Sequence, residues 1–301
     1  MDPIKPLKIS KDMKISSLID EMKNTGFNSR NLSLGSDILE KAIKDKDCKL
    51  FVGFAGALVP AGMKQIFIDM IEKGWISVLV TTGANLTHDL IEALGFKHYI
   101  GDEKADDSKL LKKGYNRIYN IFMENKVYQK LESWFEKNFD ELNSESNTEF
   151  LNKIGKLVKN SNSILAACYK NKIPIFCPAL SDSGIGLMVW SMMTRKKVPK
   201  MNEYHDLYKM LDLAWHKNKS IFYIGGGTPK NYIQQAMQFS NPAKWGVQIK
   251  IDDASYGGSS GAPLKEGISW GKLDKKANFV DITCDATIAL PLIYSKLLDK
   301  I

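Results

Sequence analysis

The stretch "SIFYIGGGTPKN", residues 220–231, decides the fold class. Its apolar run is typical of a strand buried on both faces, and the glycines and Thr-Pro pair that follow are typical of a turn into a helix. Similar apolar runs are found at 49–56, 76–82 and 278–283, with shorter candidates at 173–176 and 245–251. The sequence therefore predicts an α/β fold with a doubly wound, Rossmann-like, mostly parallel sheet that has helices on both faces.

The chain is 301 residues long and contains no proline- or serine-rich linker that would divide it. We predict a single domain over residues 1–301 with an N-terminal helical extension. The charged, amphipathic stretch from about 106 to 170 is too long for a loop and carries no strand signal. It is expected to form two or three helices outside the sheet.

The formal net charge of +8 is compatible with nucleic-acid binding, but only three of the 42 basic residues are arginines, at positions 30, 117 and 195. Arginine is preferred for phosphate and base-edge contacts. The lysine excess therefore indicates a solvated surface, and no nucleic-acid partner is expected. Attraction of an acidic protein partner stays open.

The first thirty residues lack the apolar core of a signal peptide, and no run of 18 apolar residues occurs. We expect a soluble, cytoplasmic protein with no membrane partner. The four cysteines are widely scattered in apolar settings and are expected to be small core residues. The four histidines have no metal-ligand spacing, so no metal site is predicted, and His88 is expected on a helix surface.

A ligand is expected in the turns after the predicted strands, because these turns begin at the carboxyl edge of such a sheet. The turns lie at 53–62, 81–89, 178–186, 225–231, 252–272 and 284–291. Bare glycine backbone at 225–227, with Thr228 as a helix N-cap, is suited to bind an anion. Because the dinucleotide fingerprint is incomplete here, tight packing of strand against helix is the alternative reading.

The segment "GISWGKL", residues 267–273, combines an indole, glycines and a lone lysine, with Glu266 just ahead of it. A lysine is nucleophilic only as the neutral amine, and an apolar wall such as Trp270 would favour this form of Lys272. The alternative is that Lys272 is an ordinary surface charge. The glycine-rich loop at 252–272 has enough backbone freedom to fold over a ligand, which favours a catalytic role.

The "SWGK" motif and the "GGSSGAPLKEG" loop before it are similar to those of the deoxyhypusine synthases, in particular the shorter archaeal form. The segments "PALSDSGIG", "IGGGTPKN", "TTGANLTHDL" and "TGFNSRNLSLGSDIL" extend the resemblance over nearly the whole chain. It implies an enzyme that uses NAD to transfer the aminobutyl group of spermidine to one lysine of the initiation factor 5A precursor. The transfer would form deoxyhypusine through an enzyme-lysine imine. A homotetramer with active sites between subunits is also implied.

By this resemblance, Lys272 corresponds to the lysine that carries the imine. Glu266 and Trp270 correspond to residues that bind spermidine, and Asn231 and Ser259 lie at further substrate-binding positions. The cofactor-binding positions that match are Thr82, Gly83, Ala84, Asp182, Gly226, Gly227, Asp285 and Ala286. The residues alone favour local roles for two of these, with Asp285 as a helix N-cap and Asp182 as a turn acceptor.

Eukaryotic members of the family carry acidic residues where this chain has Leu187 and Ser259, and a histidine where it has Asn231. These differences leave the amine donor and acceptor open. Asp252, Asp253 or groups from another subunit are alternative partners for the amine. The first alternative function is a homospermidine synthase-like transfer to putrescine or another amine. The second is a non-enzymatic module that binds the factor or a nucleotide.

Overall fold

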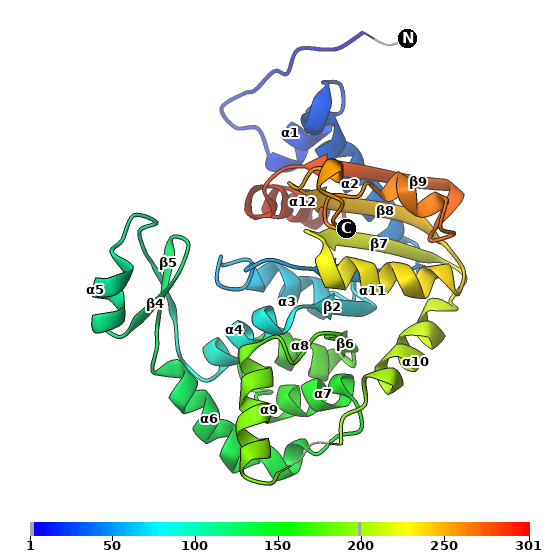
Figure 1. Ribbon diagram of the computed structural model, residues 1–301. Coiled ribbons are helices and arrows are strands. Elements are labelled where there is room, and N and C mark those ends of the chain that lie inside the picture. Colours follow the sequence, from blue (N-terminus) through cyan, green and yellow to red (C-terminus); the bar gives the residue numbers. More distant parts are fainter. Residues whose placement is uncertain (1–2, 198–199) are drawn as a thin grey trace. The chain divides into compact units, whose positions relative to one another are not determined.

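The computed structural model describes residues 3–197 and 200–301 (Figure 1). The described chain folds as two compact units. The first unit comprises residues 3–55, 74–80 and 207–301, and the second comprises residues 56–73, 81–197 and 200–206. Each unit has its own set of predicted site residues.

The six strands predicted from apolar runs are all present. They are β1 (Lys49–Phe54), β2 (Val78–Thr81), β6 (Ile175–Phe176), β7 (Lys219–Ile224), β8 (Ala243–Lys250) and β9 (Leu273–Thr283). They form one sheet in the order β6-β2-β1-β7-β8-β9, in which β1–β7, β7–β8 and β8–β9 pair in parallel. Strand order changes direction between β1 and β7, which confirms the doubly wound α/β fold.

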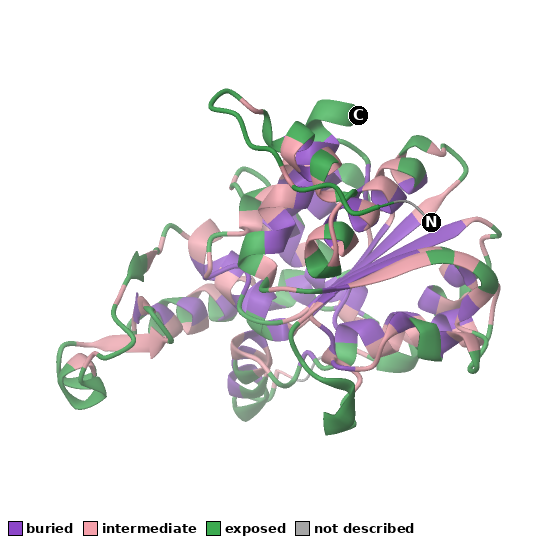
Figure 2. Cartoon of the chain, turned by 90° about the horizontal axis from the view of Figure 1, so that it is seen from above, coloured by how far each residue is buried: buried purple, intermediate pink, exposed green. Residues whose placement is uncertain are grey.

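Helices cover both faces of the sheet in the first unit. Gly35 of α2 (Phe27–Lys44) lies against one face, where a Cβ would come within 2.8 Å of Ile282 and 3.2 Å of Val247. Gly53 of β1 faces α11 (Gly227–Gln238) on the other side, where a Cβ would lie 3.0 Å from Ile233. Strands between two helical layers must be apolar on both faces, which explains their unbroken apolar runs and their burial (Figure 2).

The N-terminal residues form two helices that pack on the C-terminal helix. α1 (Ile15–Met22) and α2 both contact α12 (Ala286–Lys300). Lys296 of α12 is buried, and its amine pairs with Asp20 of α1 at 2.7 Å and Asp37 of α2 at 2.6 Å. A buried ammonium needs such partners, so these contacts fix the two helices to the unit. The remaining helical segments with residues in this unit are α10 (Glu203–Ala214), η2 (Ala254–Tyr256) and η3 (Leu264–Ile268).

The second unit contains a small antiparallel sheet that the sequence did not reveal. Its strands are β3 (His98–Ile100), β4 (Tyr115–Ile118) and β5 (Ile121–Glu124), in the order β3-β5-β4. The expectation of helices alone over 106–170 is therefore wrong. β4 and β5 are short and mostly half-buried, so their alternation is too weak to distinguish from an amphipathic helix. The two strands are joined by a two-residue hairpin turn in which Tyr119 has a φ of 53°.

Residues 106–170 contain more helical segments than the two or three expected from the sequence. The segments within that range are α5 (Asp107–Lys112), α6 (Val127–Asn138), η1 (Phe139–Leu142) and α7 (Asn147–Leu157), with α8 (Ile164–Asn171) at its end. The others are α3 (Lys64–Glu72), α4 (Gly83–Ala93) and α9 (Gly184–Thr194). Across the described residues, no helix combines the length and apolar character needed to cross a bilayer.

The cysteines agree in part with the expectation of small core residues. Cys168 and Cys177 are buried, whereas Cys48 and Cys284 are only half-buried, and all four are free thiols. Burial raises the pKa of Cys177 to about 12, which keeps this thiol protonated and unreactive.

Candidate active site

A glycine turn leads from β7 into α11 in the first unit. Gly225 and Gly227 have φ values of 75° and 63°, a conformation that favours glycine. Gly226 is the N-cap of α11, and no side chain caps the helix there. The expected N-cap at Thr228 is therefore wrong, because the freedom of the glycine backbone lets the helix begin at Gly227. The bare amides of this helix start are suited to bind an anionic ligand.

The glycine turn is in close contact with the loop that joins β8 to β9. A Cβ on Gly226 would lie 2.2 Å from the Cα of Ser260, so only glycine fits at this point. The hydroxyl of Ser259 donates to the carbonyl of Gly227 at 3.4 Å. Asn231 lies one turn further into α11 and is half-buried. The structure thus brings Gly226, Gly227 and Ser259 together, with Asn231 on the adjoining helix.

The loop from residue 251 to Lys272 returns from the carboxyl ends of the strands to their amino ends. It leaves the carboxyl end of β8, and Lys272 directly precedes the amino end of β9, where its carbonyl accepts from the Ala243 amide at 3.3 Å. The expectation that every ligand turn lies at the carboxyl edge is therefore wrong for Lys272. Two neighbouring parallel strands require a connection that returns along the sheet.

Lys272 and Trp270 contact each other as their spacing suggested. The Lys272 amine lies 4.9 Å from the centroid of the indole ring, within the range of a cation–π contact. Trp270 is 56% exposed, so in the isolated chain the indole forms a platform for the amine and does not enclose it. Glu266 is exposed in η3 of the same loop. The three residues offer a flat apolar surface, an amine and a carboxylate to an incoming ligand.

Asp285 and Ala286 follow β9 at the carboxyl edge of the sheet. Asp285 is the N-cap of α12, and its carboxylate accepts from the Thr287 amide at 2.7 Å and from the Thr287 hydroxyl at 2.5 Å. This confirms the capping role expected from the sequence. Ala286 is the first residue of α12. A role of either residue in cofactor binding stays a prediction.

The predicted cofactor residues of the second unit also lie together. The Thr82 hydroxyl caps α4 by accepting from the Asn85 amide at 3.5 Å. A Cβ on Gly83 would lie 2.5 Å from the Cβ of Ser183, which in turn caps α9. Asp182 directly precedes Ser183 and is exposed, as is Ala84. Two helix starts therefore meet at this point, and their closeness requires glycine at position 83.

The expectation that His88 lies on the surface of α4 is wrong. It is half-buried, and its Nδ1 lies 2.9 Å from Nε2 of His98, whose Nδ1 lies 2.7 Å from Glu92. Glu92 also pairs with Lys64. Burial, followed by the neighbouring His98, lowers the pKa of His88 to about 4. The histidine is therefore neutral at physiological pH and belongs to a half-buried chain of polar side chains within the second unit.

Four buried or half-buried polar residues beneath the 252–272 loop were missed in the sequence. They are Lys230, Gln248, Lys250 and Asp281, all of which hydrogen-bond to the loop backbone. A signal was present for Lys230, which precedes the apolar residues Ile233 and Met237 by three and seven positions. That spacing places a lysine on the buried face of its helix, where it needs hydrogen-bond partners.

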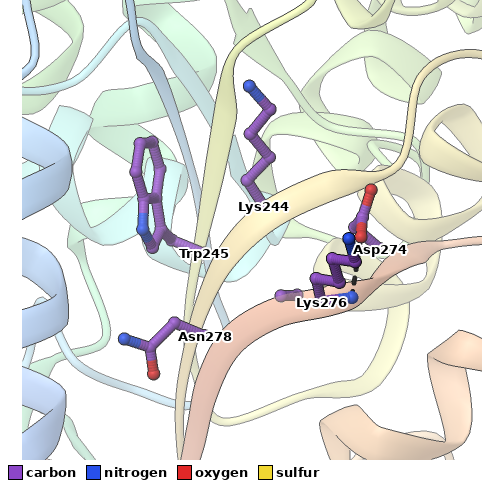
Figure 3. Close-up of a pocket in the computed structure, with 6 residues that line it drawn as sticks. Lys244, Trp245, Asp274, Lys276 and Asn278 are labelled. Carbon is purple, nitrogen blue, oxygen red and sulfur yellow. Dashed lines mark hydrogen bonds between the residues drawn. The ribbon is translucent and has the colours of Figure 1, made fainter.

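The structure also contains two hollows. One, of about 470 Å³ in the second unit, is lined in part by Pro178, Leu187, Trp190 and Met193. The other, of about 340 Å³ in the first unit, is shown in Figure 3 and is lined by Lys244, Trp245, Asp274, Lys276, Ala277 and Asn278. It lies at a bulge of β9, where pairing passes from Ala243–Leu273 to Trp245–Asn278. Neither hollow is lined by a predicted site residue.

The family model described as deoxyhypusine synthase matches residues 17–297. The chain belongs to the deoxyhypusine synthase family. A relative named "Probable deoxyhypusine synthase 1", from Archaeoglobus fulgidus, is 38% identical over 295 residues, which cover 97% of each chain.

Among solved structures, a "putative deoxyhypusine synthase" from Entamoeba histolytica matches with a TM-score of 0.67 and 19% identity, covering 97% of this chain and 96% of that one. A complex of AgrE with ornithine and NAD+ matches with a TM-score of 0.58 and 13% identity, covering 91% of this chain and 34% of that one. At these identities the likeness shows the fold alone.

Proposed function

We propose that this protein catalyses the NAD-dependent transfer of the aminobutyl group of spermidine to one lysine of the initiation factor 5A precursor. The observation that carries the proposal is the position of the Lys272 amine over the indole of Trp270, at the end of a loop that packs on the glycine turn of α11. Membership of the deoxyhypusine synthase family supports it. The proposed acceptor is a translation factor, so we also propose a cytoplasmic location.

Lys272 would act as the nucleophile of the transfer. Its amine would attack the carbon of the oxidised, imine form of spermidine, and the bond from that carbon to the departing diaminopropane nitrogen would break. The four-carbon fragment would then be held on Lys272 through a carbon–nitrogen double bond. In the second half of the reaction, the acceptor lysine would attack the same carbon and release Lys272 as a free amine. The enzyme lysine is thereby regenerated in each cycle.

Trp270 and Glu266 would hold the polyamine during these steps. The exposed face of the indole can stack on the hydrocarbon and cationic parts of spermidine. Glu266, in the same loop, can accept a charge-assisted hydrogen bond from one ammonium end. Ser259 and Asn231, beside the glycine turn, would supply uncharged polar contacts where eukaryotic members have charged or ionisable groups.

The residues of the first unit fit a dinucleotide. The uncapped start of α11, with glycine at 226 and 227, offers backbone amides to a pyrophosphate. Asp285 and Ala286 are proposed as further contacts in this unit, and the NAD+ complex of AgrE has a related fold. In the second unit, taken by itself, the Thr82–Ala84 turn and Asp182 keep their predicted role as cofactor-binding residues. When bound, NAD would supply hydride chemistry, by accepting a hydride from the amine and returning it to the transferred imine.

Exposed apolar side chains support our proposal of a homotetramer. Tyr256, Trp270 and Ile288 are 79%, 56% and 58% exposed in the single chain. Large apolar side chains are enriched at interfaces between subunits. Covering Trp270 by another subunit would also exclude water from the amine, which imine chemistry requires.

Borohydride trapping tests the central step. We expect that the protein, incubated with labelled spermidine and NAD and then reduced, carries the label on the peptide that contains Lys272. The Lys272→Ala variant should lose the label and at least about 1,000-fold of the transfer rate, while NAD binding changes less than about threefold. Lys265→Ala, in the same loop, is the matched control and should keep the label. Full transfer by Lys272→Ala would refute the assignment.

The acceptor is tested by offering initiation factor 5A precursor and putrescine in parallel. The exposed position of Leu187 and the bond of Ser259 to Gly227 give a specific reason to include the second acceptor, because neither side chain supplies the negative charge found in eukaryotic members. Label in the protein acceptor supports the main proposal. Label found only in homospermidine would favour the homospermidine synthase-like alternative. Binding of the factor without any trapped adduct would favour a non-enzymatic module.

A further inference from the structure

Four consecutive carbonyls of the loop before Glu266 accept hydrogen bonds from side chains of the first unit. The carbonyls of Ser259 and Ala262 accept from the Lys230 amine at 2.7 and 2.5 Å. The Ser260 carbonyl accepts from Gln248 at 3.1 Å. The Gly261 carbonyl accepts from Lys250 at 2.7 Å. Backbone in an irregular loop usually turns such groups to water, so this segment is anchored to the unit.

Lys230 makes two of these four bonds from a buried position. Lys230 is only 1% exposed, and its amine lies between α11 and the loop. The charged groups that act on it are Asp281 and Lys250 from the strands, and Glu266 and Lys272 from the loop. Burial is the main influence and lowers the pKa of Lys230 to about 8. An amine that is this deeply buried is stable only while the carbonyls remain in place.

The position of Lys230 links the glycine turn to the loop. Lys230 lies in the first turn of the helix that starts at Gly226 and Gly227. Its amine holds the carbonyls of Ser259 and Ala262, and between these two residues lies Ser260, whose Cα packs on Gly226. Loss of the Lys230 amine would leave two half-buried carbonyls without this donor and release this contact. The segment that continues to Glu266, Trp270 and Lys272 would then lose its fixed starting point.

We propose that Lys230 is a positioning residue that anchors the loop at Ser259 and Ala262 and thereby fixes the placement of Glu266, Trp270 and Lys272. This inference rests on the proposed function of Lys272. Lys230 does not itself serve as a nucleophile, because its amine is buried and engaged with two carbonyls. It acts on the polyamine only through the loop.

The test is the Lys230→Met variant, which removes the donor and keeps an unbranched apolar chain. We expect amide hydrogen exchange over residues 258–264 to rise at least about tenfold, since hydrogen bonds from a charged group are lost. The KM for spermidine should rise about tenfold with a smaller change in kcat, and NAD binding should change less than about threefold. Lys244→Met, at an exposed lysine of β8, is the matched control and should leave all three values unchanged.

Unchanged loop exchange, or an unchanged KM for spermidine, in a folded Lys230→Met protein would overturn the proposal. If that variant does not fold, the Lys230→Gln variant, which retains one donor group, takes its place. Loop exchange and the KM for spermidine are then measured on this variant and judged in the same way. Failure of the proposed function would be recognised separately, because the wild-type protein would then form no adduct on Lys272. The exchange measurement needs no substrate and reports on the anchoring in either case.

Discussion

The two halves of residues 259–272, in the loop between β8 and β9, are held in opposite ways. In the first half, the backbone carbonyls of residues 259–262 bond to buried or half-buried side chains, and Leu264 is almost fully buried. In residues 265–272, Glu266, Ser269 and Trp270 are exposed. The first half is therefore fixed by the core, whereas the second presents its side chains outward. Functional loops on rigid scaffolds commonly divide in this way.

The exposed half is nevertheless closed by its own backbone. The Lys272 amide donates to the Gly267 carbonyl at 2.8 Å, and the Gly271 amide donates to Ile268 at 3.1 Å. The amide of Leu264 is held by the carboxylate of Asp281 at 3.1 and 3.2 Å. The second half is thus a compact turn between two fixed ends. Its side chains can meet a ligand without a large loss of backbone order.

The largest effect on the loop is expected from Gly226→Ala, because the added Cβ would lie 2.2 Å from the Cα of Ser260. The anchored half would have to move, at a cost of about 2–3 kcal/mol in the free energy of unfolding. We expect the yield of borohydride-trapped adduct to fall along with it. Urea unfolding and trapping measure the two effects.

Gly258→Ala is the matched control for this substitution. Its added Cβ would approach nothing closer than 3.5 Å, so the free energy of unfolding should change by less than about 0.5 kcal/mol. Equal behaviour of the two variants would show that contact between loop and glycine turn does not matter for the fold.

An intermediate effect is expected from Trp270→Leu, in the exposed half. Loss of the indole should raise the KM for spermidine about tenfold, because a cation–π contact with the polyamine disappears. The free energy of unfolding should change by less than about 0.5 kcal/mol, since the side chain is 56% exposed. Steady-state kinetics and urea unfolding are the measurements. Trp215→Leu, at another exposed tryptophan, is the control, and a stability loss larger than the kinetic effect would contradict the division into halves.

The smallest effect is expected from Asp285→Ala, outside the loop. It removes the bond to the Thr287 amide at the start of α12 and should cost about 1 kcal/mol in the free energy of unfolding. Asp285→Asn keeps an acceptor and should cost less. Thermal unfolding of the two variants gives the free energy that one capping hydrogen bond contributes. The loss measured for Gly226→Ala, which disturbs the anchored half, can then be compared with this value. A cost above about 2 kcal/mol for Asp285→Ala would mean that the residue has more than a capping role in the fold.

The sequence was sufficient for features that depend on local pattern. The apolar runs that became β1, β7 and β8 are buried on both faces, so their composition alone distinguishes them from surface strands. Asp285 was recognisable as a cap because it follows a strand and begins a helix. The contact between Trp270 and Lys272 was recognisable because the two residues are neighbours along the chain.

Features that depend on distant residues were not recognisable. The hairpin of β4 and β5 has little burial of its own, and its pattern resembles that of the helices around it. His88 appears in the sequence as one of four scattered histidines, and the spacing that indicates burial of Lys230 does not reveal the groups to which it bonds. Their partners lie at Ser259, Ala262 and His98, and only the folded chain brings these groups together.

The sequence by itself determined the fold class, the positions of the six strands of the large sheet and, through its short motifs, the family, because strand burial and short motifs are written in adjacent residues. The tertiary structure decided which end of β9 carries Lys272, which half of the loop is anchored, and that a buried lysine does the anchoring. These depend on hydrogen bonds between groups about thirty positions apart, such as Lys230 and Ala262. A polar group gains such a partner only when burial removes it from water, and burial is a property of the whole fold.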